Sequence, residues 1–261
     1  MKKKISAKGL NCASYKDDFL KRRLEGRIHF RGLSSYLDYA HYMDKNPSEF
    51  NDLSDALTIN VSEFCRDSSV WNSFQNKFLP SIIANKIATG ERKLKIWSAG
   101  CADGEEPYTL AIVILEALSY NRGNFKVEII GTDIDLPSLD RAKKGIYAPQ
   151  RLRLVSKSIL QRYFTPSDDG NLKLSEDVKK RVTFMLHDLS MPPPASGFDA
   201  ISCRNVIIYF SKDLQQMLFR NFCSALVPGG YLILGKVESI LGESGELFKC
   251  VDLPERIYRK Y

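Results

Sequence analysis

Three carboxylates in a glycine turn are the residues of this sequence with the clearest chemical meaning. The apolar stretch Leu94–Trp97 predicts a short strand, and the turn after it carries Asp103, Glu105 and Glu106. Pro107 and the apolar residues beyond it predict that a helix begins at this turn. A strand, a tight glycine turn and a helix form the opening unit of nucleotide-binding α/β sheets.

The charge of this turn distinguishes it from a phosphate site. Phosphate-binding turns present bare N–H groups, often with a lysine, to an anion, whereas three carboxylates would repel a pyrophosphate. They suit an adenosine-like ligand that lacks phosphate and carries positive charge, and S-adenosylmethionine is such a ligand. The alternative is that these acids only stabilise the N-terminus of the helix, where negative charge is favourable.

Two further acids follow predicted strands. Asp133 comes directly after the strand that begins at Lys126, where a carboxylate can accept both ribose hydroxyls of a nucleoside. Asp135 is predicted to cap the next helix, which leaves Asp133 available. Asp188 ends another predicted strand and either reaches the adenine end of a pocket or forms a turn.

The segment Ile201–Phe210 is the second stretch with chemical potential. It predicts an apolar strand that ends in Arg204 and Asn205, and ligands of open α/β sheets bind at such carboxyl ends. Tyr209 lies just beyond, near the expected site of methyl transfer. The alternative is that the residues after Asn205 belong to the core and that Arg204 pairs with a surface acid.

Composition and cysteine usage exclude several classes of protein. The chain has 261 residues, 44% of them hydrophobic, which suits one large domain or two unequal ones. No apolar run of about 18 residues predicts a membrane span, and no apolar segment follows the basic start Met1–Lys4, so we expect no signal peptide. The six cysteines form no C-x-x-C pair and the three histidines are far apart, which argues against a metal centre and favours reduced, cytoplasmic thiols.

The net charge of +7 implies an acidic partner. Basic residues gather in Lys21–Arg27 and at Arg31, either to face that partner or as a solvated helix face. Nucleic-acid binders often interleave aromatic residues for base stacking. Phe30 and Tyr36 are the only nearby aromatic candidates, which gives little support to nucleic-acid binding.

The order of predicted elements indicates an α/β fold with two additions. Apolar residues recur at helical spacing from residue 12 to about 58 without a strand, which predicts a small all-helical domain. From Trp71 onward strands and helices alternate, as in a doubly wound, mostly parallel sheet. Between Gly145 and Arg181 this alternation breaks, and turn residues there predict a small hairpin insert.

Several segments match a known pattern in order and spacing over nearly the whole chain. They are Thr58–Arg66, Trp97–Tyr108, Thr132–Asp135, Lys143–Tyr147, Gln161–Phe164, Phe198–Asp199, Cys203–Phe210 and Pro228–Gly230. Through them the chain resembles the CheR-type chemotaxis receptor methyltransferases, which methylate glutamates on the signalling helices of chemoreceptors.

The resemblance implies a Rossmann-like S-adenosylmethionine-dependent methyltransferase, a protein-glutamate O-methyltransferase, that uses no metal and releases S-adenosylhomocysteine. It implies an N-terminal helical domain (residues 1–57), a linker lining the cofactor site (58–70) and a Rossmann-like domain (71–261). An antiparallel β-subdomain is inserted at about 146–181. The expected partner is the cytoplasmic signalling domain of chemoreceptors, bound through the basic N-terminal helix and the β-subdomain.

The resemblance also assigns roles to single residues. Arg66 and Tyr209 would flank the methyl group. The expected cofactor contacts are Asn60, Ser62, Arg66, Gly100, Glu106, Asp133, Asp188, Leu189, Asn205 and Val206. Three positions depart from the family pattern: Ser62 replaces a threonine and keeps the hydroxyl, Asp188 replaces an asparagine and loses an amide donor, and Cys65 replaces an aromatic residue.

The expected reaction is an in-line displacement in which a glutamate oxygen attacks the sulfonium methyl. Because a carboxylate is already ionised at neutral pH, no general base is needed. Arg66 could hold the substrate carboxylate, and Tyr209 could fix the methyl group or the carboxylate. The alternatives are a nucleic-acid or small-molecule methyltransferase, which the missing Asn-Pro-Pro-aromatic motif disfavours, and a non-catalytic scaffold that binds S-adenosylmethionine, which Arg66 and Tyr209 together disfavour.

Overall fold

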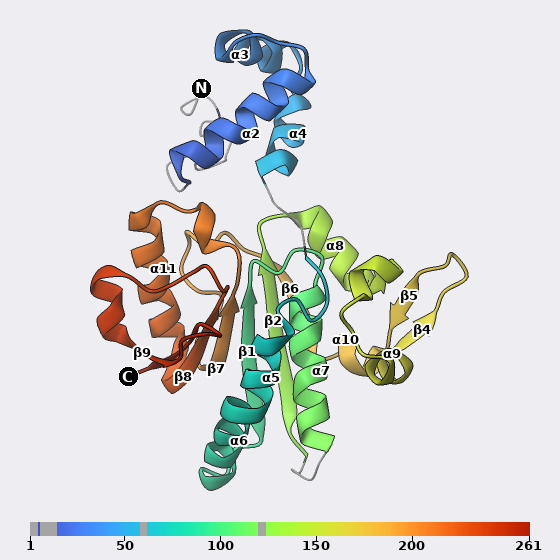
Figure 1. Cartoon of the computed structure of the whole chain (residues 1–261), viewed down its shortest axis with the longest axis vertical. Coiled ribbons are helices and arrows are strands. Elements are labelled where there is room, and N and C mark those ends of the chain that lie inside the picture. The colour runs from blue at the N-terminus through green and yellow to red at the C-terminus, as the bar shows by residue number, and fades with distance from the viewer. Residues whose placement is uncertain (1–4, 6–14, 58–61, 120–123) are drawn as a thin grey trace. The chain divides into compact units, whose positions relative to one another are not determined.

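The computed structural model describes residues 5, 15–57, 62–119 and 124–261, and the chain divides into two compact units (Figure 1). One unit contains Met1–Ile59 and Ile207–Met217, and the other contains Asn60–Val206 and Leu218–Tyr261. Among the helices within these described ranges, none has both the length and the apolar character needed to cross a bilayer.

The first unit is all-helical in its described part. It contains α2 (Asp17–Phe30), α3 (Tyr36–Lys45), α4 (Glu49–Leu57) and the short 3-10 helix η4 (Ile207–Tyr209). The apolar residues Phe19, Leu20, Leu24 and Ile28 recur at helical spacing along α2 and are buried against the other helices. The all-helical domain predicted from the sequence periodicity is therefore observed.

Two arginines of the basic cluster form ion pairs with acids inside this unit. Arg27 of α2 and Arg31 directly after it both bind Glu49 of α4, with Nη2–Oε1 and Nη2–Oε2 distances of 2.6 and 2.7 Å. Both also reach Asp52, and the Tyr39 hydroxyl donates to Glu49, whose side chain is only 1% exposed. Burial alone would raise the pKa of Glu49, but the hydrogen bonds from these partners outweigh it and hold that pKa below its usual value.

The second unit is built on a seven-stranded sheet of order β6-β2-β1-β7-β8-β10-β9. Its pairs are parallel except those of β10, which runs antiparallel to β8 and β9. The strands are β1 (Lys93–Ala99), β2 (Lys126–Asp133), β6 (Val182–Leu186), β7 (Phe198–Cys203), β8 (Leu226–Leu234), β9 (Phe248–Asp252) and β10 (Ile257–Lys260). The sequence predicted the parallel strands, and the C-terminal hairpin of β9 and β10 makes the sheet mixed.

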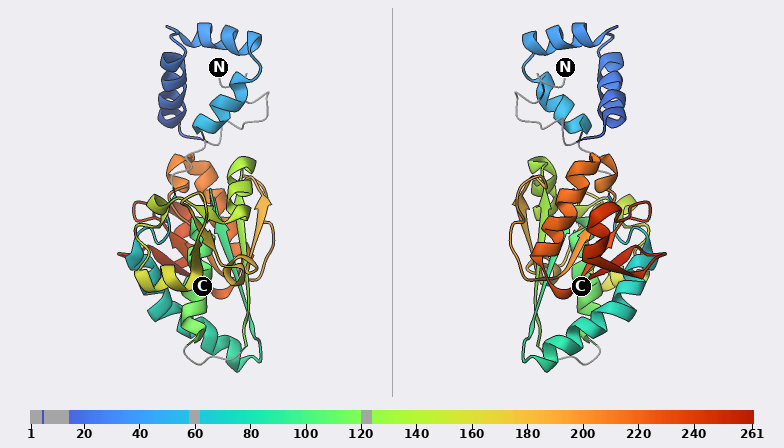
Figure 2. Two further views of the ribbon diagram at one scale, coloured as in Figure 1. Left: turned by 90° about the vertical axis from the view of Figure 1, so that its right-hand side faces the viewer. Right: turned by 90° about the vertical axis from the view of Figure 1, so that its left-hand side faces the viewer.

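Helices cover both faces of this sheet, as the edge views of Figure 2 show. Ile96 of β1 joins the core beneath α7, whereas its neighbour Trp97 packs its ring 5.4 Å from Phe222 of α11. The helices are α5 (Ser68–Ser73), the π-helix η2 (Phe74–Phe78), α6 (Leu79–Ala88), α7 (Glu105–Ser119), α8 (Leu136–Lys144), α11 (Lys212–Ala225) and the 3-10 helix η5 (Gly242–Leu247). The first residues of α11 belong to the helical unit.

The break in the α/β alternation is a small antiparallel sheet with short helices around it. The sheet has the order β3-β5-β4, and the turn between β4 and β5 is the one the sequence predicted. Its elements are β3 (Ile146–Tyr147), the 3-10 helix η3 (Pro149–Leu152), α9 (Lys157–Tyr163), β4 (Phe164–Pro166), β5 (Leu172–Leu174) and α10 (Glu176–Lys179). The predicted fold class is thus confirmed: an α/β sheet with an N-terminal helical part and an antiparallel insert.

Candidate active site

The candidate residues of the α/β unit gather at one edge of the sheet. The chain leaves β1 toward β2 and β6, then returns to the other side of β1 to form β7. Ligands of open α/β sheets bind at such a switch point, outside the carboxyl ends of the strands. Gly100 and Glu106 follow β1, Asp133 ends β2, and Asn205 follows β7.

Four N–H groups of the glycine turn after β1 donate hydrogen bonds to acceptors within the protein. The amides of Gly100 and Cys101 both donate to the Thr132 carbonyl, at 2.8 and 2.9 Å. Ala102 donates its amide to Asp133 Oδ2 at 2.7 Å, and Gly104 donates to the Cys101 carbonyl. Because a phosphate site needs such groups unpaired, this turn is unsuited to phosphate.

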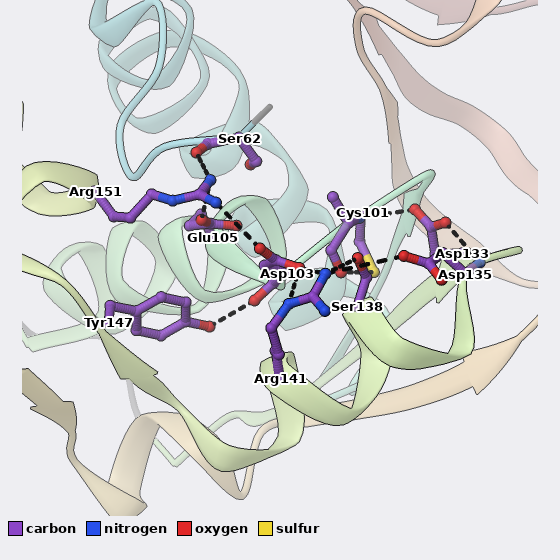
Figure 3. Close-up of polar contacts among 11 residues, drawn as sticks. Ser62, Cys101, Asp103, Glu105, Asp133, Asp135, Ser138, Arg141, Tyr147 and Arg151 are labelled. Carbon is purple, nitrogen blue, oxygen red and sulfur yellow. Dashed lines mark hydrogen bonds and ion pairs between the residues drawn. The ribbon is translucent and has the colours of Figure 1, made fainter. Parts of the chain in front are cut away.

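Two of the three acids in this turn bind arginines of the protein itself, as Figure 3 shows. Asp103 pairs with Arg141 at 2.8 Å and with Arg151 at 3.2 Å, and Glu105 pairs with Arg151 at 3.1 Å. Asp103 and Glu105 are thus paired with arginines of the protein, whereas the prediction had assigned all three carboxylates to a cationic ligand. Glu105 is fully buried, and a buried charge requires a counter-charge. Burial raises the pKa of Glu105, and Arg151 offsets part of that rise.

The third acid, Glu106, belongs to a polar chain that ends at Arg66. The Ser98 hydroxyl donates to Glu106 Oε1 at 2.8 Å, and Arg204 Nη1 lies 3.5 Å from Oε2. Arg204 Nη2 donates to Asp67 at 2.6 Å and to the Arg66 carbonyl at 3.2 Å. One alternative from the sequence was that Arg204 pairs with an acid at the surface. It does pair with acids, but its side chain is only 2% exposed, so these pairs lie inside the protein.

The segment that carries Arg66 has an unusual backbone. Cys65 and Asp67 have φ angles of 56° and 53°, in the left-handed region that L-residues adopt at a cost. The Arg66 carbonyl accepts from Trp71 Nε1 at 2.9 Å as well as from Arg204, and the Cys65 amide donates to Thr109 Oγ1. Tertiary contacts thus hold the residues on both sides of Arg66 in a conformation that local propensity disfavours.

Asp133 keeps acceptor capacity for a ligand. Its Oδ2 accepts the Ala102 amide and its Oδ1 accepts the Asp135 amide at 3.0 Å. Each carboxylate oxygen has a further lone pair, so two hydroxyl groups can still donate to this side chain. Burial raises the pKa of Asp133. Asp135 stands at the N-cap of α8 as predicted, but its side chain makes no capping hydrogen bond.

Asn205 and Val206 are held by a residue that sequence reasoning missed. Glu238, which is buried, accepts the amides of Asn205 and Gly235 on Oε2, at 2.9 and 2.7 Å, and the amide of Val206 on Oε1 at 3.0 Å. A Cβ at Gly235 would lie 2.7 Å from that carboxylate, so glycine is needed there. An acid shortly after a strand, between two apolar stretches, was the available signal.

The remaining predicted residues fall into three groups. The segment of Asp188 and Leu189 begins beside Asp133, since the His187 amide donates to the Asp133 carbonyl at 2.9 Å; Asp188 itself accepts the Ser190 amide in a turn. Asn60 lies outside the described residues. Tyr209 belongs to the helical unit, where its ring packs 4.8 Å from that of Phe19.

These features fit an adenosine-type ligand without phosphate. The N–H groups of Gly100, Cys101, Ala102 and Gly104 are satisfied, and Asp133 can accept two hydroxyls. Gly100 has no room for a side chain, because an added Cβ would lie 2.6 Å from Val206. The described part of the chain contains no group of three or more histidine, cysteine or acidic side chains that could hold a metal ion.

Two family models match the sequence and together span most of it. "CheR methyltransferase, SAM binding domain" matches residues 60–257, and "CheR methyltransferase, all-alpha domain" matches residues 7–58. The chain belongs to the CheR methyltransferase family. The resemblance inferred from the motifs is thereby confirmed, and the α/β unit with its glycine turn is the S-adenosylmethionine-binding domain of a CheR protein.

Relatives within the CheR family cover most of this chain. The chemotaxis protein methyltransferase of Borreliella burgdorferi is 33% identical over 238 residues, which are 90% of this chain and 84% of that protein. Chemotaxis protein methyltransferase 1 of Vibrio cholerae is 38% identical over 201 residues, 75% of this chain and 71% of that protein. The chemotaxis protein methyltransferase of Salmonella typhimurium is 32% identical over 241 residues, 88% and 79% of the two chains.

Proposed function

We propose that this CheR-family protein transfers methyl groups from S-adenosylmethionine to glutamate side chains of chemoreceptors, in chemotactic adaptation. The observation that carries the proposal is the match of both CheR domains along the chain, and Gly100, Glu106, Asp133 and Asn205 at the carboxyl ends of neighbouring strands support it. The resulting activity is that of a protein-glutamate O-methyltransferase. Because the signalling domains of chemoreceptors are cytoplasmic, we propose the same compartment for the enzyme.

We propose different roles for the individual cofactor contacts in the α/β unit. S-adenosylmethionine supplies an electrophilic methyl group when bound. Asp133 accepts the ribose hydroxyls, and Glu106, oriented by Ser98 and Arg204, faces the positive charge of the cofactor. The remaining proposed contacts are Asn60, Ser62, Arg66, Gly100, Asp188, Leu189, Asn205 and Val206. The linker 58–70 lines the cofactor site in this proposal.

Arg66 and Tyr209 are the proposed catalytic residues. A guanidinium can bind a carboxylate through paired hydrogen bonds and so aim one oxygen at the methyl group. Since a glutamate carboxylate is ionised at neutral pH, neither a general base nor a metal is needed to activate it. Alignment then supplies most of the rate enhancement. We propose that the Tyr209 hydroxyl completes this alignment.

Two surfaces are proposed to contact the receptor. On α2 the exposed cations are Lys21 and Arg22, because Arg27 and Arg31 are committed to Glu49. The second surface is the β3-β5-β4 sheet with its short helices. Besides Arg151 and Arg153, which bind acids of the glycine turn and the linker, it carries six cations (Lys157, Arg162, Lys173, Lys179, Lys180 and Arg181) and four acids (Asp168, Asp169, Glu176 and Asp177) within residues 146–181. Both surfaces therefore suit an acidic partner.

The experiment that tests the proposal supplies labelled S-adenosylmethionine with receptor-rich membranes and measures base-labile label on protein. Glutamyl methyl esters release methanol in base, whereas N-methylated bases do not. Arg66→Ala is expected to lower kcat by about a hundredfold or more while the thermal midpoint stays close to that of wild type. The control is Arg92→Ala, which removes an exposed arginine before β1 and is expected to leave the rate unchanged. Label on added RNA, or full activity of Arg66→Ala, would contradict the proposal.

A further inference from the structure

Arg151 joins three segments of the α/β unit that are far apart in the sequence. It lies in η3 of the insert, and its guanidinium donates to Glu105 Oε1 at 3.1 Å and to Asp103 Oδ2 at 3.2 Å (Figure 3). The same guanidinium also donates to the Ser62 carbonyl of the linker. One side chain therefore connects the insert, the glycine turn and the linker.

The main chain around Arg151 holds the same linker residues. The Phe64 amide donates to the Arg151 carbonyl at 3.0 Å. The Phe64 ring is fully buried and packs edge-on against the rings of Tyr147 and Phe164, at 4.8 and 5.4 Å between centroids. The linker is thus held at residues 62 and 64, directly before Cys65, whose backbone is left-handed, and Arg66.

The charges of the cluster also depend on Arg151. Asp103 is balanced by Arg141 as well, and its carbonyl accepts the Tyr147 hydroxyl at 2.8 Å. In the described part of the chain Arg151 is the cation paired with Glu105, which is fully buried. The Glu105 carboxylate at the start of α7 therefore binds the Arg151 guanidinium, and that guanidinium in turn binds the linker.

We propose that Arg151 is a positioning residue for methyl transfer: it sets the linker, and with it Ser62 and Arg66, against the glycine turn. The inference rests on the proposed function for its catalytic readout, because Arg66 acts on the substrate there. It assigns Arg151 no contact with substrate or cofactor. Its effect reaches the site through the Ser62 carbonyl and the Phe64 amide.

Replacing Arg151 with lysine distinguishes the effect of its charge from the effect of its hydrogen-bonding geometry. Arg151→Lys keeps a cation near Glu105, but one ammonium cannot serve Glu105, Asp103 and the Ser62 carbonyl in the planar arrangement of a guanidinium. The matched control is Arg153→Lys, two residues along. Arg153 also binds the linker, through Glu63 at 2.8 Å, but its side chain is 69% exposed, and such pairs contribute little.

The measurements are kcat and KM for receptor methylation, the thermal midpoint, and calorimetric titration with S-adenosylhomocysteine. For Arg151→Lys we expect kcat to fall at least about tenfold and the dissociation constant for S-adenosylhomocysteine to rise severalfold, with KM for receptor within about twofold of wild type. Arg153→Lys should stay within about twofold of wild type in every quantity.

The result that overturns the proposal is an Arg151→Lys protein with a lowered thermal midpoint but wild-type kcat and S-adenosylhomocysteine affinity, since a merely structural residue would behave in this way. If Arg151→Lys fails to fold, the double variant Arg151→Met with Glu105→Gln removes both charges and is read by the same criteria. The titration needs no receptor. If wild type methylates no receptor, the proposed function fails, while the titration still decides whether Arg151 positions the linker.

Discussion

Each unit contains an arginine–carboxylate network, but one network joins two helices of a core and the other joins the segments around the candidate site. In the helical unit Arg27 and Arg31 bind Glu49 and Asp52, and the bonds join α2 to α4 within one small core. In the α/β unit Arg151 binds Asp103 and Glu105 and reaches the linker beside the candidate site. The first network holds helices together, and the second holds the segments of a site.

The comparison shows that clustered charge in a sequence does not reveal its partner. The basic residues near Arg27 suggested an acidic binding partner, and the acids near Glu105 suggested a cationic ligand. In each case part of the cluster is neutralised inside its own unit. Of the basic cluster, Lys21 and Arg22 are the exposed cations on α2, and Glu106 is the acid of the turn for which we propose a contact with the ligand.

The largest effect is expected when the helical network loses its central acid. Glu49→Ala removes a buried carboxylate with two arginine partners, and breaking such a pair costs about 3–5 kcal/mol. Both tryptophans, Trp71 and Trp97, belong to the α/β unit, so their fluorescence follows that unit alone. Far-UV circular dichroism follows the helices of both. We expect an early dichroism transition in urea with an unchanged tryptophan transition.

The control for this variant is Glu25→Ala, which removes an exposed acid of α2 that lies 4.0 Å from Lys21 and accepts the exposed Tyr36 hydroxyl at 3.0 Å. It should change stability by less than about 1 kcal/mol. A Glu49→Ala protein whose dichroism and fluorescence transitions both coincide with those of wild type would mean that this network contributes little to the helical unit.

A smaller effect is expected from Glu238, a carboxylate of the α/β unit that binds N–H groups. Glu238→Gln keeps one oxygen acceptor but presents an NH2 group to amides that themselves donate. Losing a charge-assisted hydrogen bond at Asn205 or Val206 should weaken S-adenosylhomocysteine binding about tenfold. Calorimetry measures this. An affinity equal to that of wild type would show that the Asn205 turn keeps its conformation without Glu238.

Charge reversal tests whether the exposed cations of α2 bind the receptor. Lys21→Glu with Arg22→Glu is expected to raise KM for receptor severalfold at low salt and to leave S-adenosylhomocysteine affinity unchanged. Lys45→Glu, on the exposed end of α3, is the matched control. If the double variant and the control behave alike, the α2 surface is a solvated helix face.

The smallest expected effect is a difference in pH dependence between Glu49 and Glu105. The folded pKa of Glu49 lies below its unfolded value, so its ionised form stabilises the protein, and this contribution is lost as pH falls through that folded pKa. Burial raises the folded pKa of Glu105, so ionisation costs stability above that pKa. Between about pH 7 and about pH 4, the cost of Glu49→Gln should therefore shrink and that of Glu105→Gln should grow. Urea unfolding read by dichroism for Glu49→Gln and by tryptophan fluorescence for Glu105→Gln measures both costs, and parallel trends would contradict this assignment.

The sequence predicted those parts of the fold that have a strong local signal. The spacing of Phe19, Leu20 and Leu24 predicted α2, and the apolar run before Gly100 predicted β1. The hairpin of the insert was predicted from its turn residues, whereas the C-terminal hairpin was not predicted, because its short strands carry too few residues for such a pattern. The sequence could not predict which side chains pair, because Arg151 lies 46 residues from Glu105 and Glu238 lies 33 residues from Asn205. Partners at that separation are set by the folded sheet, not by local spacing.

The measurement that tests the central claim most directly is calorimetric titration of the purified wild-type protein with S-adenosylhomocysteine, and separately with ATP. The account predicts saturable binding of the first compound with one molecule per chain, and no heat from the second, because four turn amides are already bonded and Glu106 repels phosphate. Binding of ATP without binding of S-adenosylhomocysteine would contradict it.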